Sequence, residues 1–490
     1  MAASNHSIKT AVVIISFLFV SASGFIYSEE ITPDIAGAAA EQNDEKPGIK
    51  TAKNFFLPPL EIIGANNAFG IVTKHVLREP WAQVNGETIQ KNLHSRWAWD
   101  QDGLLVNQFG HPYQGSLYYN AARANGFNFY ASAAFTLAGS TLWELLGEIY
   151  DPSMNDRIST TLGGAAFGEM LHRLYLETPS PLAVLISPMD ALNSAITKKH
   201  PKRGNDRIHR LAASFGAGWS NAAYFSPEKQ RQPYFSVPVL DAEVAVIYGS
   251  PFEGARKTPY EHFELNLGVA AGMDFAKYNL ALSSDGYVFS FAPLAAEKQK
   301  ATTGLTIHYD YFDSNVLGLF SYALDWTVKY QRVLNALRLE TKAHAGWTVF
   351  GGSFFMNPAI QQRGIEDFVY GNSSFLNPAT GKNERTEYNN FGTGINAKLS
   401  FSLASLSCGQ FEFGAKIYKL FNIAYNVPET AGNELYCFLE SSYWFPVGTQ
   451  TAIGISGSFS IKNSNLTVME HIRSRDGTIS ACVKRFLIRK

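Results

Sequence analysis

Charge is scarce in this 490-residue sequence: Asp, Glu, Lys and Arg make up 17% of it, against about 25% in ordinary soluble domains. The formal net charge of −1 excludes a strongly basic nucleic-acid binder and an acidic disordered tail. Cysteine is scarce too, and no pair among Cys408, Cys437 and Cys482 has the C-x-x-C spacing of a zinc or redox motif. We therefore predict packing cysteines and no nucleic-acid partner.

A high average hydropathy is also missing, although the sequence is rich in aromatic residues. The mean hydropathy is −0.09, and Phe, Trp and Tyr make up 13% of the chain. A bundle of transmembrane helices would be far more hydrophobic, and a disordered chain would have fewer aromatic residues. What remains is a large globular protein or a transmembrane β-barrel, whose strands alternate polar with apolar residues.

The N-terminus has the pattern of an export signal. Lys9 precedes an apolar run at residues 11–20, and the small residues Ser-Ala-Ser-Gly follow it. This order is typical of a secretory signal peptide, and the run is shorter than the roughly 20 apolar residues that span a bilayer. We predict a signal peptide at 1–24, with an uncleaved anchor as the alternative, and a polar disordered leader at 25–52.

Residues 53–200 show little strand-like alternation, and we interpret them as a helical domain. Ser153, with Asp156 three residues later, is a candidate N-cap for one of its helices. The acid Glu144 would be costly in a lipid-facing helix, so the apolar segment around it is predicted to be buried in a bundle or in a barrel plug. We expect helices over residues 54–76, 127–147 and 158–175.

The last of these predicted helices contains three glycines, Gly163, Gly164 and Gly168. A glycine inside a helix costs about 1 kcal/mol relative to alanine. A helix that contains three of them is therefore predicted to be closely approached, either by another helix or by a membrane component.

From about residue 206 the hydrophobic pattern changes to a period of two, which is typical of strands. In residues 337–350, for example, Leu339 and Trp347 alternate with Glu340 and Lys342. Most such segments are long enough for the 9–11 residues that a membrane-spanning strand takes. We expect about 12 strands, over residues 208–221, 234–248, 259–273, 278–292, 302–312, 318–331, 337–350, 388–403, 409–425, 433–445, 450–461 and 477–487.

These patterns predict an α+β fold, with a helical domain at 53–200 followed at 205–490 by an antiparallel transmembrane β-barrel of about 12 strands (10–14). The export signal, the strand length and the aromatic residues at strand ends favour the membrane barrel over a secreted soluble β-protein. Charges of both signs alternate on the predicted inner face, which favours a mixed or ion-paired lumen over a filter of one sign. The aromatic strand ends are Tyr234-Phe235, Tyr287, Tyr309 to Phe312 and Tyr443 to Phe445.

One part of the helical domain carries a family resemblance. The string HPYQGSLYYNAARANG at 111–126 is followed by GSTLWE at 139–144, PSMND at 152–156 and TTLGG at 160–164. Together these motifs resemble a bacterial family of exported proteins, domain of unknown function 3943, over about residues 60–180. The resemblance implies an exported, outer-membrane-associated protein with a helical N-terminal domain followed by strands, and it implies no reaction.

The helical domain also concentrates polar side chains that could perform chemistry. A nucleophile such as Ser116 or Tyr119, activated by His111, would suggest hydrolysis of a lipid or an envelope polymer. Ser116 lacks the flanking glycines of a G-x-S-x-G elbow, and the sequence contains no Walker, Rossmann or HExxH motif, so we predict no cofactor. The catalytic candidates are His111, Tyr119, Arg123, Glu144, Glu148, Asp156, Glu169 and His172.

Metal binding and simple ion pairing are two further interpretations of the same residues. Helical di-metal sites use inward-facing Glu and Glu-x-x-His sets, and the sequence has one such motif where two are needed. The competing interpretation is a buried network in which Arg123 or Arg173 pairs with Glu144, Glu148 or Asp156. The weak metal candidates are Glu144, Glu148, Glu169 and His172.

The sequence therefore predicts an outer-membrane barrel with a structural, binding or transport role in the cell envelope. Its helical domain is expected to be periplasmic or to lie in the barrel as a plug. The expected partners are outer-membrane lipids, the barrel-assembly machinery and a small or lipidic solute. Two alternatives stay open: a membrane-embedded enzyme acting on lipid or envelope glycan through the helical polar residues, and a secreted soluble β-protein that binds a ligand.

Overall fold

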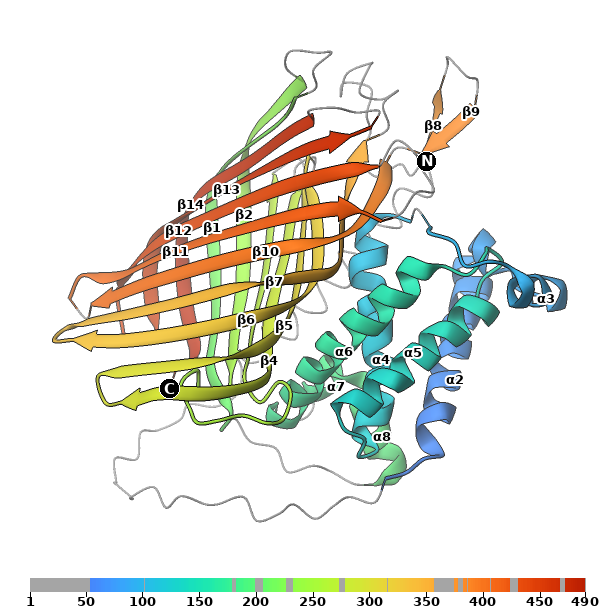
Figure 1. Cartoon of the computed structure of the whole chain (residues 1–490), viewed down its shortest axis with the longest axis horizontal. Coiled ribbons are helices and arrows are strands. Elements are labelled where there is room, and N and C mark those ends of the chain that lie inside the picture. The colour runs from blue at the N-terminus through green and yellow to red at the C-terminus, as the bar shows by residue number, and fades with distance from the viewer. Residues whose placement is uncertain are drawn as a thin grey trace.

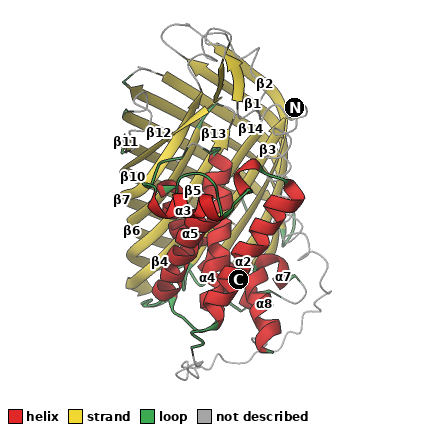
Figure 2. Ribbon diagram, turned by 90° about the vertical axis from the view of Figure 1, so that its right-hand side faces the viewer, coloured by secondary structure: helices red, strands yellow, loops and turns green. Residues whose placement is uncertain are grey.

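The computed structural model contains a bundle of helices followed by a barrel of strands (Figures 1 and 2). The predicted signal peptide and leader, at 1–24 and 25–52, lie outside the described residues. The structure describes residues 53–100, 102–178, 182–198, 206–225, 232–272, 278–314, 316–356, 374–377, 382–385, 387–405, 407–423, 431–467 and 472–489.

The bundle holds the three predicted helices and several that the sequence did not indicate. None of the described helices is both long and apolar enough to cross a membrane. Single turns at Val72–Leu77, Pro80–Ala82 and Val106–Gly110 connect or extend the longer helices. The α-helices are α2 (Leu57–Ile71), α3 (Gly86–His94), α4 (His111–Ala124), α5 (Phe129–Leu146), α6 (Met154–Glu177), α7 (Ala183–Ile186) and α8 (Pro188–Thr197).

The ends of two helices follow from local sequence. The Ser153 side chain accepts a hydrogen bond from the backbone N–H of Asp156, which confirms the predicted N-cap of α6. At the end of α4, Gly126 has a φ of 88°, a left-handed conformation that glycine adopts without steric cost.

Helices α4 and α6 cross at glycines, as the glycine-rich segment predicts. A Cβ atom on Gly164 would lie 2.6 Å from the Gly115 backbone, and one on Gly168 would lie 2.8 Å from Tyr119. No real side chain fits at such distances, so the two helix backbones are in direct contact. This contact fixes the position of Tyr119 and Arg123 on α4 relative to Glu169 on α6.

Twelve antiparallel strands close into a barrel in the order β1-β14-β13-β12-β11-β10-β7-β6-β5-β4-β3-β2, which confirms the predicted fold class. A separate hairpin, β8 (Ser374–Asn377) and β9 (Lys382–Arg385), was not predicted. The barrel strands are β1 (Ile208–Phe225), β2 (Gln232–Tyr248), β3 (Phe263–Gly272), β4 (Tyr278–Ala296), β5 (Gln299–Ser314), β6 (Gly318–Leu334), β7 (Leu337–Met356), β10 (Glu387–Ser405), β11 (Gly409–Asn422), β12 (Gly432–Pro446), β13 (Thr451–Leu466) and β14 (Ile472–Arg489).

Ion pairs between distant strands identify the inner face of the barrel. Lys329 on β6 pairs with Glu264 on β3, although β4 and β5 lie between these strands in the sheet. The salt bridge therefore crosses the lumen. Because successive side chains of a strand point to opposite faces, the neighbours of Lys329 point outward, and Val328 is exposed there. A belt of exposed apolar side chains covers this outer face, including Trp326, Trp347, Ile395, Ile417, Ile455 and Ile479.

The helical bundle packs on the outer wall of the barrel. The Tyr322 hydroxyl, which points outward from β6, donates to Gln108 Oε1 at 3.0 Å. The Trp99 ring stacks on Phe391 and Phe350 with centroid distances of 5.5 and 6.1 Å, and Figure 1 shows the helices beside the strands. The plug expected as one alternative is therefore wrong, because the bundle contacts outward-pointing side chains.

The position of the bundle also corrects part of the expected aromatic girdle. Tyr309 and Tyr311 are buried on the outer face, and the Tyr309 hydroxyl donates to the backbone carbonyl of Gln108 beneath the helices. Tyr287 points into the lumen, where the Lys329 ammonium lies 5.3 Å from its ring centroid. Tyr443 and Phe445 are exposed on the outer face, as a girdle requires.

Candidate functional site

The centre of the helical bundle is an ion-pair cluster around Glu169 of α6. Glu169 Oε2 accepts from Arg123 Nε at 2.8 Å and from the Tyr119 hydroxyl at 2.6 Å, while Oε1 accepts from Arg173 Nε at 2.8 Å. Arg173 also donates to the backbone carbonyl of Pro259, next to the barrel. Both arginines thus pair with Glu169, and the expected pairing with Glu144, Glu148 or Asp156 is wrong.

The electrostatics of this cluster keep Glu169 ionised. Burial alone would raise the pKa of Glu169, but the two guanidinium groups outweigh burial and lower that pKa to about 2. Burial, together with the same carboxylate, raises the pKa of Tyr119. Neither group is therefore poised to exchange a proton near neutral pH, and the cluster has the properties of a structural ion pair.

A second cluster lies where α4 and α6 begin. His111 Nε2 lies 3.6 Å from Asp156 Oδ1, and Asn155 Nδ2 bridges Asp156 and Asp100 at 2.9 and 3.1 Å. Burial raises the pKa of Asp156 and lowers that of His111, so both groups favour their neutral forms. Neighbouring Glu144 has its pKa raised by burial and by Glu148, and it accepts from the backbone N–H of Ser153 at 2.8 Å.

The remaining candidate residues, His172 and Glu148, form hydrogen bonds with other residues of the bundle. His172 Nδ1 lies 2.7 Å from Asp190 Oδ1 on α8. Glu148 accepts from Trp143 Nε1 at 2.7 Å, and burial raises the pKa of Glu148 to about 7. The structure therefore brings Tyr119, Arg123 and Glu169 together, and His111 with Asp156, but it does not assemble the four weak metal candidates into one site.

A larger polar cluster lies in the lumen. None of its residues was among the candidates predicted from the sequence. Lys342 of β7 lies 2.5 Å from Glu264 of β3 and 2.9 Å from Asp285 of β4. Lys329 of β6 lies 2.7 Å from Glu264 and 3.6 Å from Asp285, and it also contacts His262 Nε2 at 2.7 Å. These contacts join β3 and β4 to β6 and β7 through the lumen, so we call the group the lumenal ion-pair network.

The network continues toward β10. Lys398 forms an ion pair with Asp310 of β5 and lies 2.8 Å from His308 Nδ1. Lys398 and Asp310 are each only 7% exposed at the side chain, which leaves little room for water at this level. Further round, Lys462 of β13 donates to the backbone carbonyl of Phe354 on β7 at 2.7 Å. Paired side chains of opposite sign therefore lie along the lumen from β3 to β13.

Three lumenal side chains could hold a metal ion among the residues that the structure describes. Ligand atoms of His308, Asp325 and His344 lie within 4.8 Å of one another. Thr327 and Asn396 orient His344 and Asp325 through hydrogen bonds of 2.7 and 2.9 Å. However, the Lys398 ammonium faces His308 Nδ1, which leaves the proton of a neutral ring on Nε2, where a metal would bind. The surroundings therefore oppose a divalent cation.

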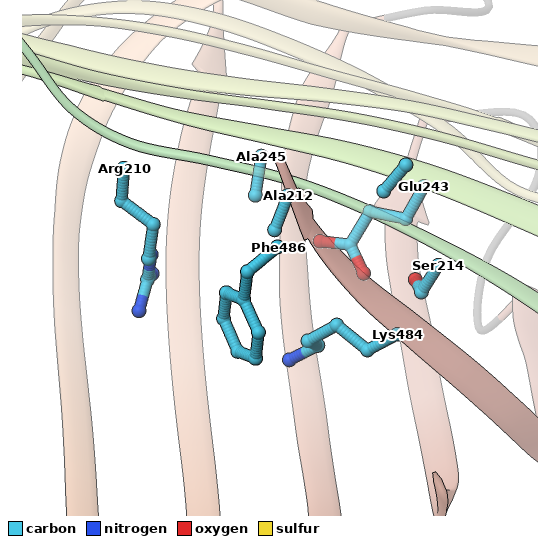
Figure 3. A pocket seen from close by; sticks show the side chains of 8 residues that line it. Arg210, Ala212, Ser214, Glu243, Ala245, Lys484 and Phe486 are labelled. Carbon is cyan, nitrogen blue, oxygen red and sulfur yellow. The ribbon is translucent and has the colours of Figure 1, made fainter. Parts of the chain in front are cut away.

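A small, open hollow lies at the end of the barrel where β1 begins and β14 ends. Figure 3 shows the side chains around it, which come from β1, β2 and β14. Charges of both signs line the hollow together with small residues and one aromatic ring. The labelled residues are Arg210, Ala212, Ser214, Glu243, Ala245, Lys484 and Phe486.

The comparisons with known proteins concern the two parts of the chain separately. Residues 96–180 match the family described as domain of unknown function (DUF3943). This match confirms the family resemblance over α4, α5 and α6. No curated protein matches the sequence.

The barrel is similar to solved outer-membrane proteins at very low identity. An outer membrane channel from Pseudomonas putida F1 is 8% identical with a TM-score of 0.30, over 57% of this chain and 95% of that one. A FadL homologue from Pseudomonas aeruginosa is 9% identical with a TM-score of 0.20, over 57% and 90%. The transport unit of the autotransporter AIDA-I from Escherichia coli is 9% identical with a TM-score of 0.22, over 56% and 91%. These likenesses concern the barrel alone and say nothing about substrate or activity.

Proposed function

We propose that this chain, whose residues 96–180 carry the DUF3943 domain, is an exported outer-membrane barrel that binds and passes a small polar solute. The observation that carries the proposal is the bridge that Lys342 makes from β7 to Glu264 and Asp285 on the facing strands. A barrel with a purely structural role could fill its lumen with apolar side chains at no desolvation cost. Charged side chains that meet across the lumen can instead separate and hydrate when a solute passes.

The composition of the network indicates the class of solute. Between β3 and β10, three lysines face four carboxylates, so this part of the lumen attracts neither cations nor anions strongly, and a neutral or zwitterionic polar solute fits it best. The hollow beside Arg210 and Glu243 has the same mixed character. Outer-membrane lipids and the barrel-assembly machinery belong to the proposal as partners. The residues counted are Lys329, Lys342, Lys398, Glu264, Asp285, Asp310 and Asp325.

The test compares two lysine substitutions in the lumen. Lys342→Ala removes a cross-lumen bridge, whereas Lys416→Ala removes a lysine that pairs at 3.2 Å with Glu440 on the adjacent strand. The purified proteins are inserted into planar lipid bilayers, and single-channel conductance is recorded. Heat-modifiable migration on gels establishes that each variant has a folded barrel.

We expect low, brief conductance from the wild type and from Lys416→Ala, and a severalfold higher conductance from Lys342→Ala. The physical reason is that Glu264 and Asp285 then draw water into the lumen. If folded Lys342→Ala conducts no more than Lys416→Ala, the network is not the barrier and the proposal of a transport barrel fails.

A further inference from the structure

The outward surface of the helical bundle is unusually apolar. On α2, Leu60 is 65% exposed, and on α5, Leu137 is 45% exposed. Comparable side chains continue along the same helices and onto α8. The exposed apolar residues of these three helices include Ile63, Ile71, Tyr130, Leu142, Leu146, Leu192 and Ile196.

The same three helices expose no charged side chain. Each contains one acid, and these acids are buried: Glu61 on α2, Glu144 on α5 and Asp190 on α8. Glu61 accepts hydrogen bonds from Asn193 at 3.0 Å and Asn125 at 3.3 Å, which keeps it inside the bundle. A helix that borders water normally presents charged residues on its outer face, and one that is apolar all round borders protein or lipid.

The apolar surface of the bundle is continuous with the lipid-facing belt of the barrel. Along β6, the outward side chains Phe320 and Tyr322 are buried beneath the helices. The next outward residues of the same strand, Leu324, Trp326 and Val328, are exposed members of the belt. The outward face of β6 is therefore apolar from the part beneath the helices to the part in the exposed belt, and no charged residue separates the two parts.

Helix length and the placement of charge agree with this continuity. Helices α2 and α5 have 15 and 18 residues, or about 22 and 27 Å at 1.5 Å per residue, close to the roughly 25 Å apolar band of outer-membrane barrels. Exposed charges appear beyond the end of α2, on α3, where Glu87 is exposed and Lys91 pairs with Asp151.

We propose that the outer faces of α2, α5 and α8 lie against the acyl chains of membrane phospholipids. The bundle thereby replaces lipid on one side of the barrel and extends the barrel's lipid-facing surface. Helix α3 then lies where the membrane surface meets water. The assignment rests on the barrel spanning a membrane and is independent of whether its lumen conducts.

The test uses fluorescent labels on single cysteines. In a background with Cys408→Ser, Cys437→Ala and Cys482→Ala, an environment-sensitive dye is attached after Leu60→Cys or Leu137→Cys. The matched references are Ile395→Cys, on the barrel belt, and Glu87→Cys, on α3. Full-length proteins are reconstituted into vesicles of phosphatidylethanolamine and phosphatidylglycerol, and quenching by doxyl-labelled acyl chains and by aqueous iodide is measured.

Labels at Leu60 and Leu137 are expected to be quenched by doxyl lipids to within twofold of the label at Ile395, and to resist iodide at least fivefold better than the label at Glu87. Quenching by iodide at the level of Glu87 would show a water-facing bundle and overturn the proposal. Protection from both quenchers would also overturn it, because a second copy of the chain would then cover this face. Heat-modifiable migration of each labelled protein shows that the barrel is folded.

Discussion

Glu169 is the buried charge on which the helical bundle depends most directly. It holds Arg123 of α4 and Arg173 of α6, and Arg173 reaches the backbone beside the barrel. Removing one partner from a buried ion pair leaves an uncompensated charge, which costs about 3–5 kcal/mol. Glu169 therefore links the two crossing helices to each other and to the outer wall.

We predict that Glu169→Gln lowers the free energy of unfolding of the bundle by about 3 kcal/mol at pH 7. The substitution keeps the shape of the side chain and removes its charge, so both guanidinium groups lose their counterion. Chemical denaturation in detergent micelles, followed by circular dichroism at 222 nm, measures the change. Glu87→Gln on α3, where Glu87 is exposed, is the matched control and should change stability by less than about 0.5 kcal/mol.

The pH dependence of stability should change in the same variant. The pKa of Glu169 falls from 4.5 to about 2 on folding, so its stabilisation is complete above pH 4.5 and is lost as the pH falls toward 2. Wild-type stability should decline over this interval, and Glu169→Gln should decline less. Parallel decline of the two proteins between pH 5 and 2 would contradict the assignment of this carboxylate as the ionised centre.

At the residue scale, the sequence indicated a concentration of polar side chains in the helical domain, and it did not indicate their pairing. The spacing of Glu169 and Arg173, four residues apart on one helix, is a local signal for their contact and was available in the sequence. The partner of Arg123 depends on the crossing of α4 over α6, which no local pattern contains. For the lumen, the sequence predicted only that charges of both signs alternate on the inner face. Which carboxylate each lysine meets depends on how the sheet closes into a barrel, and no single strand contains that information.

Among the elements, the crossing of α4 and α6 constrains the sequence most specifically, because the close contact of the two helices requires glycine. We predict that Gly164→Ala destabilises the bundle by about 1–3 kcal/mol, because its Cβ would lie 2.6 Å from the Gly115 backbone. Thermal unfolding followed at 222 nm measures this change. The control is Gly64→Ala on α2, where a Cβ meets no atom within 4 Å, and its stability should rise by up to about 1 kcal/mol. Equal effects of the two substitutions would contradict the close crossing.

Strands were more predictable than helices. The alternation placed all twelve barrel strands within a few residues of their observed bounds, because a strand with one wet and one dry face must alternate. Helix α4 was not among the expected helical ranges, since its sequence HPYQGSLYYNAARA is buried on several sides and has no single apolar stripe. The aromatic residues Tyr309 and Tyr311 were read as a membrane girdle, and the same residues serve to bind the bundle.

At the scale of the whole molecule, charge lies inside the barrel and the helical bundle lies outside it. The sequence contained both parts and could not place one against the other. The outer wall is apolar whether lipid or a helical bundle covers it. The alternating pattern of a strand therefore does not show which of the two lies against it. Stacking of Trp99 on Phe350 and Phe391 depends on residues about 250 or more positions apart, beyond the reach of local patterns.

Photo-cross-linking distinguishes a bundle on the outer wall from a plug in the lumen. A benzophenone side chain is placed at Tyr322, on the outer wall, or at Lys342, in the lumen, in proteins that show heat-modifiable migration. After irradiation and proteolysis, mass spectrometry should find the Tyr322 probe joined to peptides from residues 96–180 and the Lys342 probe joined only to strand peptides. Cross-links from Lys342 to the helices, with none from Tyr322, would show that the bundle is a plug in the lumen and does not lie on the outer wall.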